Sequence, residues 1–146
     1  MAEPSFRLRE VAHGSAEYLQ IVALRYDILR KPLGMVFTEE QLKAERDKIH
    51  LALFTDDEPV ACCMLIPFGD KVQMKQVAVK ESMQGSGLGS SLLKATEDYA
   101  LAKGFSLMYC HARETAVAFY ACNGYIIKGD MFEEIGIAHY YMEKSL

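Results

Sequence analysis

Apolar and polar residues along the chain follow two periods, one typical of strands and one typical of helices. Short alternating or continuous apolar runs predict strands at residues 6–11, 50–55, 60–68, 72–79, 105–110, 125–128 and 138–143. Apolar residues at helical spacing predict helices at residues 15–29, 38–48, about 88–103 and 115–123. The predicted order is β-α-(α)-β-β-β-α-β-α-β-β, which indicates an α/β fold in one mixed layer rather than a doubly wound sheet.

The length and composition predict a single globular domain over residues 1–146. The chain has 146 residues, of which 51% are hydrophobic and 25% charged, and this is enough for a core without disulfides or metals. No stretch approaches the roughly 18 apolar residues of a membrane span, and the first residues lack the apolar core of a signal peptide. We therefore expect a cytoplasmic protein with no membrane partner. A net charge of -4, without any run of lysine and arginine, also argues against nucleic-acid binding.

The four cysteines show neither a C-x-x-C motif nor a Cys/His spacing that would suit a metal. They are Cys62, Cys63, Cys110 and Cys122, and three of them fall in apolar strand or helix patterns. We expect buried, reduced thiols and no metal site.

Residues 84–89 read Q-G-S-G-L-G, between the predicted strand at 72–79 and the helix that follows. A Walker loop would need G-x-x-x-x-G-K-[ST], but Gly89 is followed by two serines. A dinucleotide fingerprint would need G-x-G-x-x-G, but Ser90 stands where its last glycine belongs. Two interpretations remain from the loop alone. It is either a tight turn before a helix, or a set of backbone N–H groups at a helix N-terminus that suits a pyrophosphate.

The segment Q-V-A-V-K-E-S-M-Q-G-S-G-L-G-S-S-L-L, residues 76–93, resembles the acyl-coenzyme A loop of the GNAT N-acetyltransferase superfamily. That loop follows the pattern [QR]-x-x-G-x-[GA], and Gln84, Gly87 and Gly89 match it. A second segment, A-V-A-F-Y-A-C-N-G-Y at 116–125, resembles the family's A-x-x-F-Y-x-x-x-G-[FY]. Weaker matches at Arg25, His50 and E-E-I-G-I-A-H-Y-Y-M (133–142) resemble small bacterial acyltransferases with a G-I-P-H segment, although Ala138 replaces that proline.

The resemblance covers essentially the whole chain and implies a GNAT-type central sheet, mixed and mainly antiparallel, flanked by helices. It also implies an N-acyltransferase that moves an acetyl group from acetyl-CoA to a primary amine by direct attack in a ternary complex. The strand before the loop should pair its main chain with the pantetheine arm. By matching positions, the implied cofactor-binding residues are Val77, Ala78, Val79, Gln84, Gly85, Ser86, Gly87, Leu88, Gly89, Ser90, Arg113, Ala116, Phe119 and Tyr120.

Tyr120 occupies the position of the family tyrosine that protonates the leaving thiolate. The reaction expels a thiolate, and a thiol has a usual pKa of about 8.5 against about 10 for a tyrosine. A phenol hydrogen-bonded to the sulfur can therefore donate its proton as the thiolate leaves. The alternative is a core tyrosine packed beside Phe119. Arg113 stands where the family often has an asparagine that touches the cofactor, so this arginine could instead reach a phosphate or an acidic acceptor, or remain solvated.

The group that deprotonates the attacking amine is less clearly indicated. His111, at the end of a predicted strand, and His139 are the catalytic candidates, because a histidine titrates in the range that a base needs. His50 is a rival, and so are Glu133 and Glu134, although this pair more resembles a solvated acidic turn.

Two other classes of function stay open at this point. One is a non-catalytic acyl-CoA sensor or docking module, which would have no need of Tyr120, and the other is a nucleotide-phosphate binder. For the enzyme, a small-molecule amine is the expected acceptor rather than a protein. The ends of such a sheet make a homodimer a further expectation.

Overall fold

A computed structural model describes residues 6–146 of the chain. Residues 1–5 lie outside the described part. The expectation that the first residues form no signal peptide falls partly on them. The strands are β1 (Arg7–Val11), β2 (Ile49–Thr55), β3 (Glu58–Phe68), β4 (Lys71–Val79), β5 (Leu107–Arg113), β6 (Ile126–Ile127), β7 (Phe132–Glu134) and β8 (Ile137–Ser145). The α-helices are α1 (Ala16–Arg25), α2 (Glu39–Lys43), α3 (Leu88–Ala102) and α4 (Val117–Cys122). Short π or 3-10 turns occupy Tyr26–Arg30, Lys31–Leu33, Glu81–Met83 and Glu114–Ala116.

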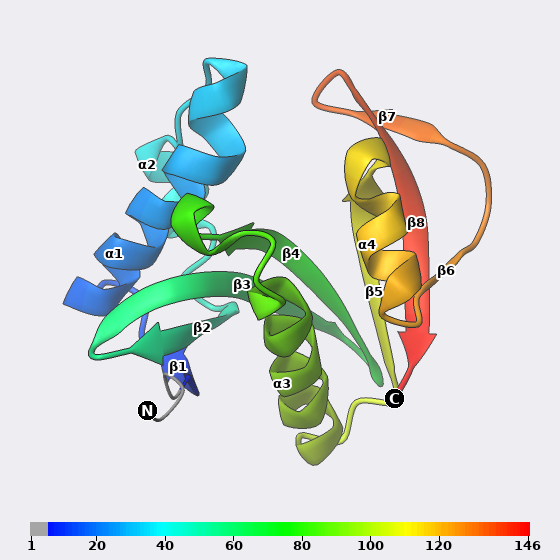
Figure 1. Cartoon of the computed structure of the whole chain (residues 1–146), viewed down its shortest axis with the longest axis horizontal. Coiled ribbons are helices and arrows are strands. Elements are labelled where there is room, and N and C mark those ends of the chain that lie inside the picture. The colour runs from blue at the N-terminus through cyan, green and yellow to red at the C-terminus, as the bar shows by residue number, and fades with distance from the viewer. Residues whose placement is uncertain (1–5) are drawn as a thin grey trace. The chain divides into compact units, whose positions relative to one another are not determined.

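The eight strands of residues 6–146 form one open sheet in the order β1-β2-β3-β4-β5-β8-β6, with β7 paired to β8 (Figure 1). The pairs β1–β2, β2–β3, β5–β8, β6–β8 and β7–β8 are antiparallel. Strand β4 pairs with β5 in parallel, in a register that runs from Lys71 to Gln73. The predicted mixed, mainly antiparallel sheet flanked by helices is confirmed.

The chain divides into two compact units, which we describe separately. Unit 1 contains residues up to 65 together with 76–96, and unit 2 contains residues 66–75 together with 97–146. The expectation of one domain over residues 1–146 stays a prediction. Across the described chain, the structure has no helix that is both long enough and apolar enough to span a bilayer.

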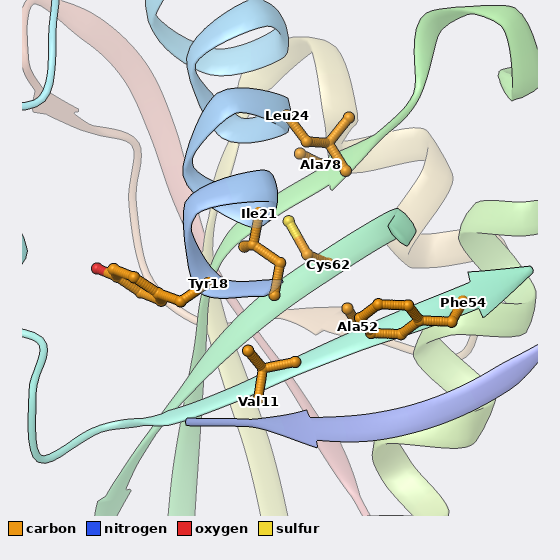
Figure 2. Packing of buried hydrophobic residues seen from close by; sticks show 8 residues of the cluster. All are labelled: Val11, Tyr18, Ile21, Leu24, Ala52, Phe54, Cys62 and Ala78. Carbon is orange, nitrogen blue, oxygen red and sulfur yellow. The ribbon is translucent and has the colours of Figure 1, made fainter. Parts of the chain in front are cut away.

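In unit 1, helix α1 packs on one face of β1 to β4. Figure 2 shows Ile21 and Leu24 pointing from α1 toward Cys62 of β3 and Ala78 of β4. Neighbouring residues on a strand face opposite sides of a sheet, so Cys63 points away from α1. Its sulfur lies 3.5 Å from the hydroxyl oxygen of Thr96, in the middle of α3. The two helices therefore cover opposite faces of this part of the sheet.

In unit 2, helix α4 lies beside β5 (Figure 1). Alternate residues of β5, namely Met108, Cys110 and Ala112, are buried. Tyr125, just after α4, is buried on the same side, and its hydroxyl lies 3.3 Å from the sulfur of Met108 and donates to Glu97 at 2.9 Å. Burial first, and then the nearby Glu97 carboxylate, raises the pKa of Tyr125, so its hydroxyl stays protonated.

The cysteine prediction holds for three of the four residues. Cys62, Cys63 and Cys110 are buried free thiols, whereas Cys122 is exposed at the end of α4. Burial raises the pKa of each of the three buried thiols to about 12, so they are inert as nucleophiles.

Several predicted boundaries are wrong. The helix predicted at 38–48 ends at Lys43, because the chain then turns to bring Glu45 into the interior. Strand β5 starts at Leu107 and runs to Arg113, since pairing with β8 continues as far as Arg113 opposite His139. Strand β7 was not predicted at all. It has only three residues and forms because its main chain pairs with β8.

Candidate functional site

The glycine loop has the backbone conformation that only glycine adopts easily. Gly85 and Gly87 have φ values of 79° and 86°, in the left-handed region. A Cβ built on either residue would meet nothing within 4 Å, so the space on that side of the loop is open. The conformation accounts for two of the three glycines, and the third, Gly89, lies in the first turn of α3.

The loop is held to the end of β4 by its own side chains. The Gln84 amide nitrogen donates to the main-chain oxygen of Val79 at 3.0 Å, and the Ser86 hydroxyl donates to the main-chain oxygen of Met83. The first helical bond runs from the Ser91 N–H to the Gly87 oxygen at 3.1 Å. The N–H groups of Leu88, Gly89 and Ser90 precede that bond and therefore have no partner within the helix.

The end of β4, next to the loop, carries the other predicted cofactor residues of unit 1. Gln76 has a φ of 54°, a left-handed residue within a strand, which is typical of a β-bulge. Beyond it the Ala78 side chain is buried in the core, while Val77 and Val79 are partly exposed. Unit 1 thus brings together Val77 to Val79 and Gln84 to Ser90.

Tyr120 lies on α4 in unit 2 and is only 7% exposed. Its ring packs edge-on against Phe119 and Tyr125, with centroid distances of 5.2 and 5.6 Å. Ala116 and Phe119, on the same short helical segment, are partly exposed, and so is Arg113 at the end of β5. The packing role considered for Tyr120 is present in the structure, and its role as a proton donor stays a prediction.

His111 and His139 meet at one carboxylate. The Glu134 side chain places Oε1 at 3.4 Å from His111 Nδ1 and Oε2 at 3.6 Å from His139 Nε2. The Phe132 ring packs edge-on against His111 at 5.1 Å and stacks on His139 at 5.9 Å. We call these four residues the histidine cluster. The alternative of an acidic turn does not hold for Glu134, because Glu134 is the last residue of β7 and contacts both histidines.

The other two rivals, Glu133 and His50, do not join this cluster. Glu133 is exposed and, one residue before Glu134, points to the other face of β7. His50 is buried in unit 1, with Nε2 at 2.9 Å from the main-chain oxygen of Glu45. Burial is the main cause that lowers the pKa of His50. A buried neutral histidine bonded to the main chain is a structural residue.

The sequence did not predict the buried ion pair between Arg25 and Glu45 in unit 1. The guanidinium of Arg25, which is 1% exposed, donates to both Glu45 oxygens at 2.8 and 2.6 Å, and the Tyr18 hydroxyl donates to Oε1 at 3.0 Å. Burial opposes the charge on Glu45, but the bonds from Arg25 and its charge outweigh burial and hold the pKa of Glu45 below its usual value. The only sequence signal was a weak family match at Arg25 and His50.

Residues 18–125 match the model of the acetyltransferase (GNAT) family, well over half of the chain. The chain belongs to the GNAT family. A Bacillus subtilis relative, the uncharacterized N-acetyltransferase YjcF, is 25% identical over 123 residues, which cover 84% of this chain and 88% of the relative.

Two solved structures have the same GNAT fold. A Lactobacillus plantarum protein assigned to the N-acetyltransferases superposes with a TM-score of 0.86 at 24% identity, covering 97% of this chain and 99% of that one. A GNAT family acetyltransferase from Elizabethkingia anophelis, solved with acetyl-CoA bound, gives 0.72 at 18% identity, covering 97% and 98%. Family membership and the relatives' names support acyltransferase activity for this GNAT protein.

The residues present fit a CoA-type group. An open cradle at Gly85 and Gly87, next to N–H groups without helical partners, suits the oxygens of a pyrophosphate. Among the residues that the structure describes, no group of three or more His, Cys, Asp or Glu side chains could hold a metal ion.

Proposed function

We propose that this GNAT protein is an N-acetyltransferase that transfers the acetyl group of acetyl-CoA to a small primary amine. The observation that carries the proposal is the loop from Gln84 to Ser90. Its left-handed glycines leave open space beside the backbone, and its helix N-terminus presents N–H groups to an anion. The neighbour with acetyl-CoA bound adds support from the same fold.

In the proposed reaction, acetyl-CoA supplies an activated acyl group as a thioester. The main chain of Val77 to Val79 orients the acyl donor, and an N–H near Val79 faces the carbonyl oxygen on which charge develops. Such a donor contributes about 3–4 kcal/mol to catalysis. Gln84 keeps the loop at the end of β4, because its amide is bonded to the Val79 oxygen.

Tyr120 is the proposed proton donor to the sulfur. Attack by the amine forms the C–N bond, the C–S bond breaks, and the thiolate takes the tyrosine proton. Two protons leave the nitrogen of an ammonium acceptor on the way to the amide: one replaces the proton that Tyr120 gave, and the other goes to a base and then to solvent. Burial of the ring between Phe119 and Tyr125 supports this role by holding the phenol in one orientation.

Calorimetric titration tests the binding step. Wild-type protein is titrated with acetyl-CoA, ATP and NAD, and the same titrations are run on Gly87→Val. We expect acetyl-CoA to bind at least about tenfold more tightly than the nucleotides, a difference of about 1.4 kcal/mol, and the valine to abolish this binding. Gly129→Val is the matched control, since Gly129 has a similar φ of 91° and a Cβ at that position would also meet nothing within 4 Å.

A thiol-release assay then follows transfer to a panel of polyamines, amino sugars, amino acids and a lysine peptide. Equal binding of all three ligands by wild type would point to a general phosphate binder. Tight acetyl-CoA binding with no transfer to any amine would favour an acyl-CoA sensor over the enzyme.

A further inference from the structure

The face of β5 and β8 that lies away from α4 gathers polar and aromatic side chains. Cys110 and Ala112 point to the buried side, so His111 between them points to the other side. The register pairs His111 with Tyr141 and Arg113 with His139, and directly opposed residues share a face. Strand β7 adds Phe132 opposite His139, and Glu134 opposite Ile137, to the same face.

The hydrogen bond to Glu134 determines which nitrogen of His111 carries the proton. An ionised carboxylate can only accept, so the contact at 3.4 Å is a hydrogen bond only when Nδ1 is protonated. In the neutral ring, Nε2 then holds a lone pair on the other side of the imidazole. The His111 side chain is 31% exposed, so a solvent-borne molecule can reach it.

His139 is fixed differently and cannot replace His111. Its Nδ1 lies 2.7 Å from the main-chain oxygen of Ile137, which can only accept, so Nδ1 carries a proton. Its Nε2 is turned to Glu134, and the side chain is only 5% exposed. Both nitrogens of His139 are thus directed at protein oxygens, and its buried ring is not accessible to a solvent-borne amine in the way that His111 is.

We propose that Glu134 is a positioning residue that holds His111 as the Nδ1–H tautomer, so that His111 Nε2 takes a proton from an ammonium acceptor. This inference rests on the proposed function and names the base and the acceptor class, a cationic primary amine. The arrangement follows the logic of a carboxylate behind a histidine base. The ring accepts one proton at Nε2 and becomes an imidazolium beside a carboxylate, and it later returns this proton to solvent.

The other ionisable groups on this face are compatible with that role. From β5 and the strands paired around it they are Lys71, Tyr109, Arg113, Glu134, His139, Tyr141 and Glu143. Burial first, and then the hydrogen bond to Glu143, raises the pKa of Tyr141 to about 12, so its phenol stays neutral at ordinary pH. Tyr109 and Tyr141 stack at 5.4 Å beside His111, and aromatic faces attract ammonium groups.

The tautomer can be measured without knowing the acceptor. Ring ¹⁵N shifts of selectively labelled protein are recorded at about pH 8, above the usual imidazole pKa of about 6.5. Neutral histidine in water prefers the Nε2–H form, so a dominant Nδ1–H form at His111 is the distinctive expected result.

Glu134→Ala should lower the Nδ1–H to Nε2–H ratio at least about threefold. Glu133→Ala, an equal loss of charge on the other face of β7, should leave the ratio unchanged. A dominant Nε2–H form in wild type, or no response to Glu134→Ala, overturns the inference.

Kinetics with whichever amine the panel identifies give the second readout. General bases contribute about 10²–10⁴-fold, so His111→Gln should lower kcat at least about 100-fold and Glu134→Ala at least about tenfold. The KM for acetyl-CoA should stay within about twofold of wild type, because the cluster acts on the amine. Full activity in Glu134→Ala would refute the positioning role of Glu134 but not the proposed acetyltransferase function. Failure of acetyl-CoA to bind would refute the proposed function, whichever tautomer His111 adopts.

Discussion

Tyr120 and Tyr125 are buried neighbours to which we assign different roles. Their rings lie 5.6 Å apart, and both are buried in unit 2. The Tyr125 hydroxyl is committed to Glu97, which also accepts from Lys144 at 2.8 Å. These bonds give Tyr125 a structural role. Tyr120 is the proposed proton donor because of its position in the family motif.

Tyr120→Phe should therefore lower kcat roughly 100-fold, since general acids contribute about 10²–10⁴-fold, and should change the affinity for acetyl-CoA by less than about twofold. Steady-state kinetics and calorimetry measure the two effects. Tyr125→Phe removes the same atom from the neighbouring ring and should keep kcat, with a loss of about 1–3 kcal/mol in the free energy of unfolding. Equal losses of kcat in both variants would reduce Tyr120 to a packing residue.

At the scale of elements, the Arg25–Glu45 pair joins the end of α1 to the chain just before β2. The Glu45 main-chain oxygen also accepts from Lys48 N–H at 3.0 Å and lies 2.9 Å from His50 Nε2. The Glu45 main chain thus links the turns that follow α2 to the first residues of β2. The Arg25 guanidinium lies 4.5 Å from the centroid of the Phe37 ring, so the pair also holds the connection between α1 and α2.

Breaking one partner of this pair leaves a buried, uncompensated charge, which costs about 3–5 kcal/mol. We expect Arg25→Met to lower the free energy of unfolding by about that amount in urea denaturation. The double variant Arg25→Met/Glu45→Leu should recover much of it, because no charge is then left alone. Lys80→Met provides the control, since it breaks an exposed pair with Glu58 and should cost at most about 1 kcal/mol. An additive double variant would show that the two buried charges do not interact.

For the whole molecule, the buried groups of unit 1 predict how stability depends on pH. Burial lowers the pKa of His50, so as pH falls below about 6.5 the unfolded chain binds this proton before the folded chain does. The folded state therefore loses stability, by at most about 1.4 kcal/mol per pH unit for one group. The pKa of Glu45 is also held down, so its contribution, complete above about pH 4.5, is lost as pH falls further.

His50→Gln should flatten the loss of unfolding free energy between about pH 6.5 and 5, measured by urea denaturation at several pH values. At about pH 8 the wild-type histidine is neutral in both states, so any difference measured there is the packing cost of the substitution. The slope is the test: parallel curves for wild type and His50→Gln would mean that His50 takes up its proton equally in both states.

Periodicity in the sequence was sufficient for the elements whose side chains divide cleanly into buried and exposed faces. Strands β1 to β4 and helix α3 came out close to their observed bounds, and so did the first helix when the π turn that continues α1 to Arg30 is included. The two motifs also led correctly to the GNAT family. These features depend on neighbours within a few residues, and local sequence determines them.

Only the tertiary structure decided the rest. Strand β7 has three residues and no period of its own, so it exists only through its bonds to β8. Glu45 and Glu134 look like solvated carboxylates in the sequence, yet folding brings one to Arg25, 20 residues away, and the other to His111, 23 residues away. A carboxylate's role depends on which side chains surround it. The partners of Glu45 and Glu134 are distant in the sequence, so no local sequence pattern reveals them.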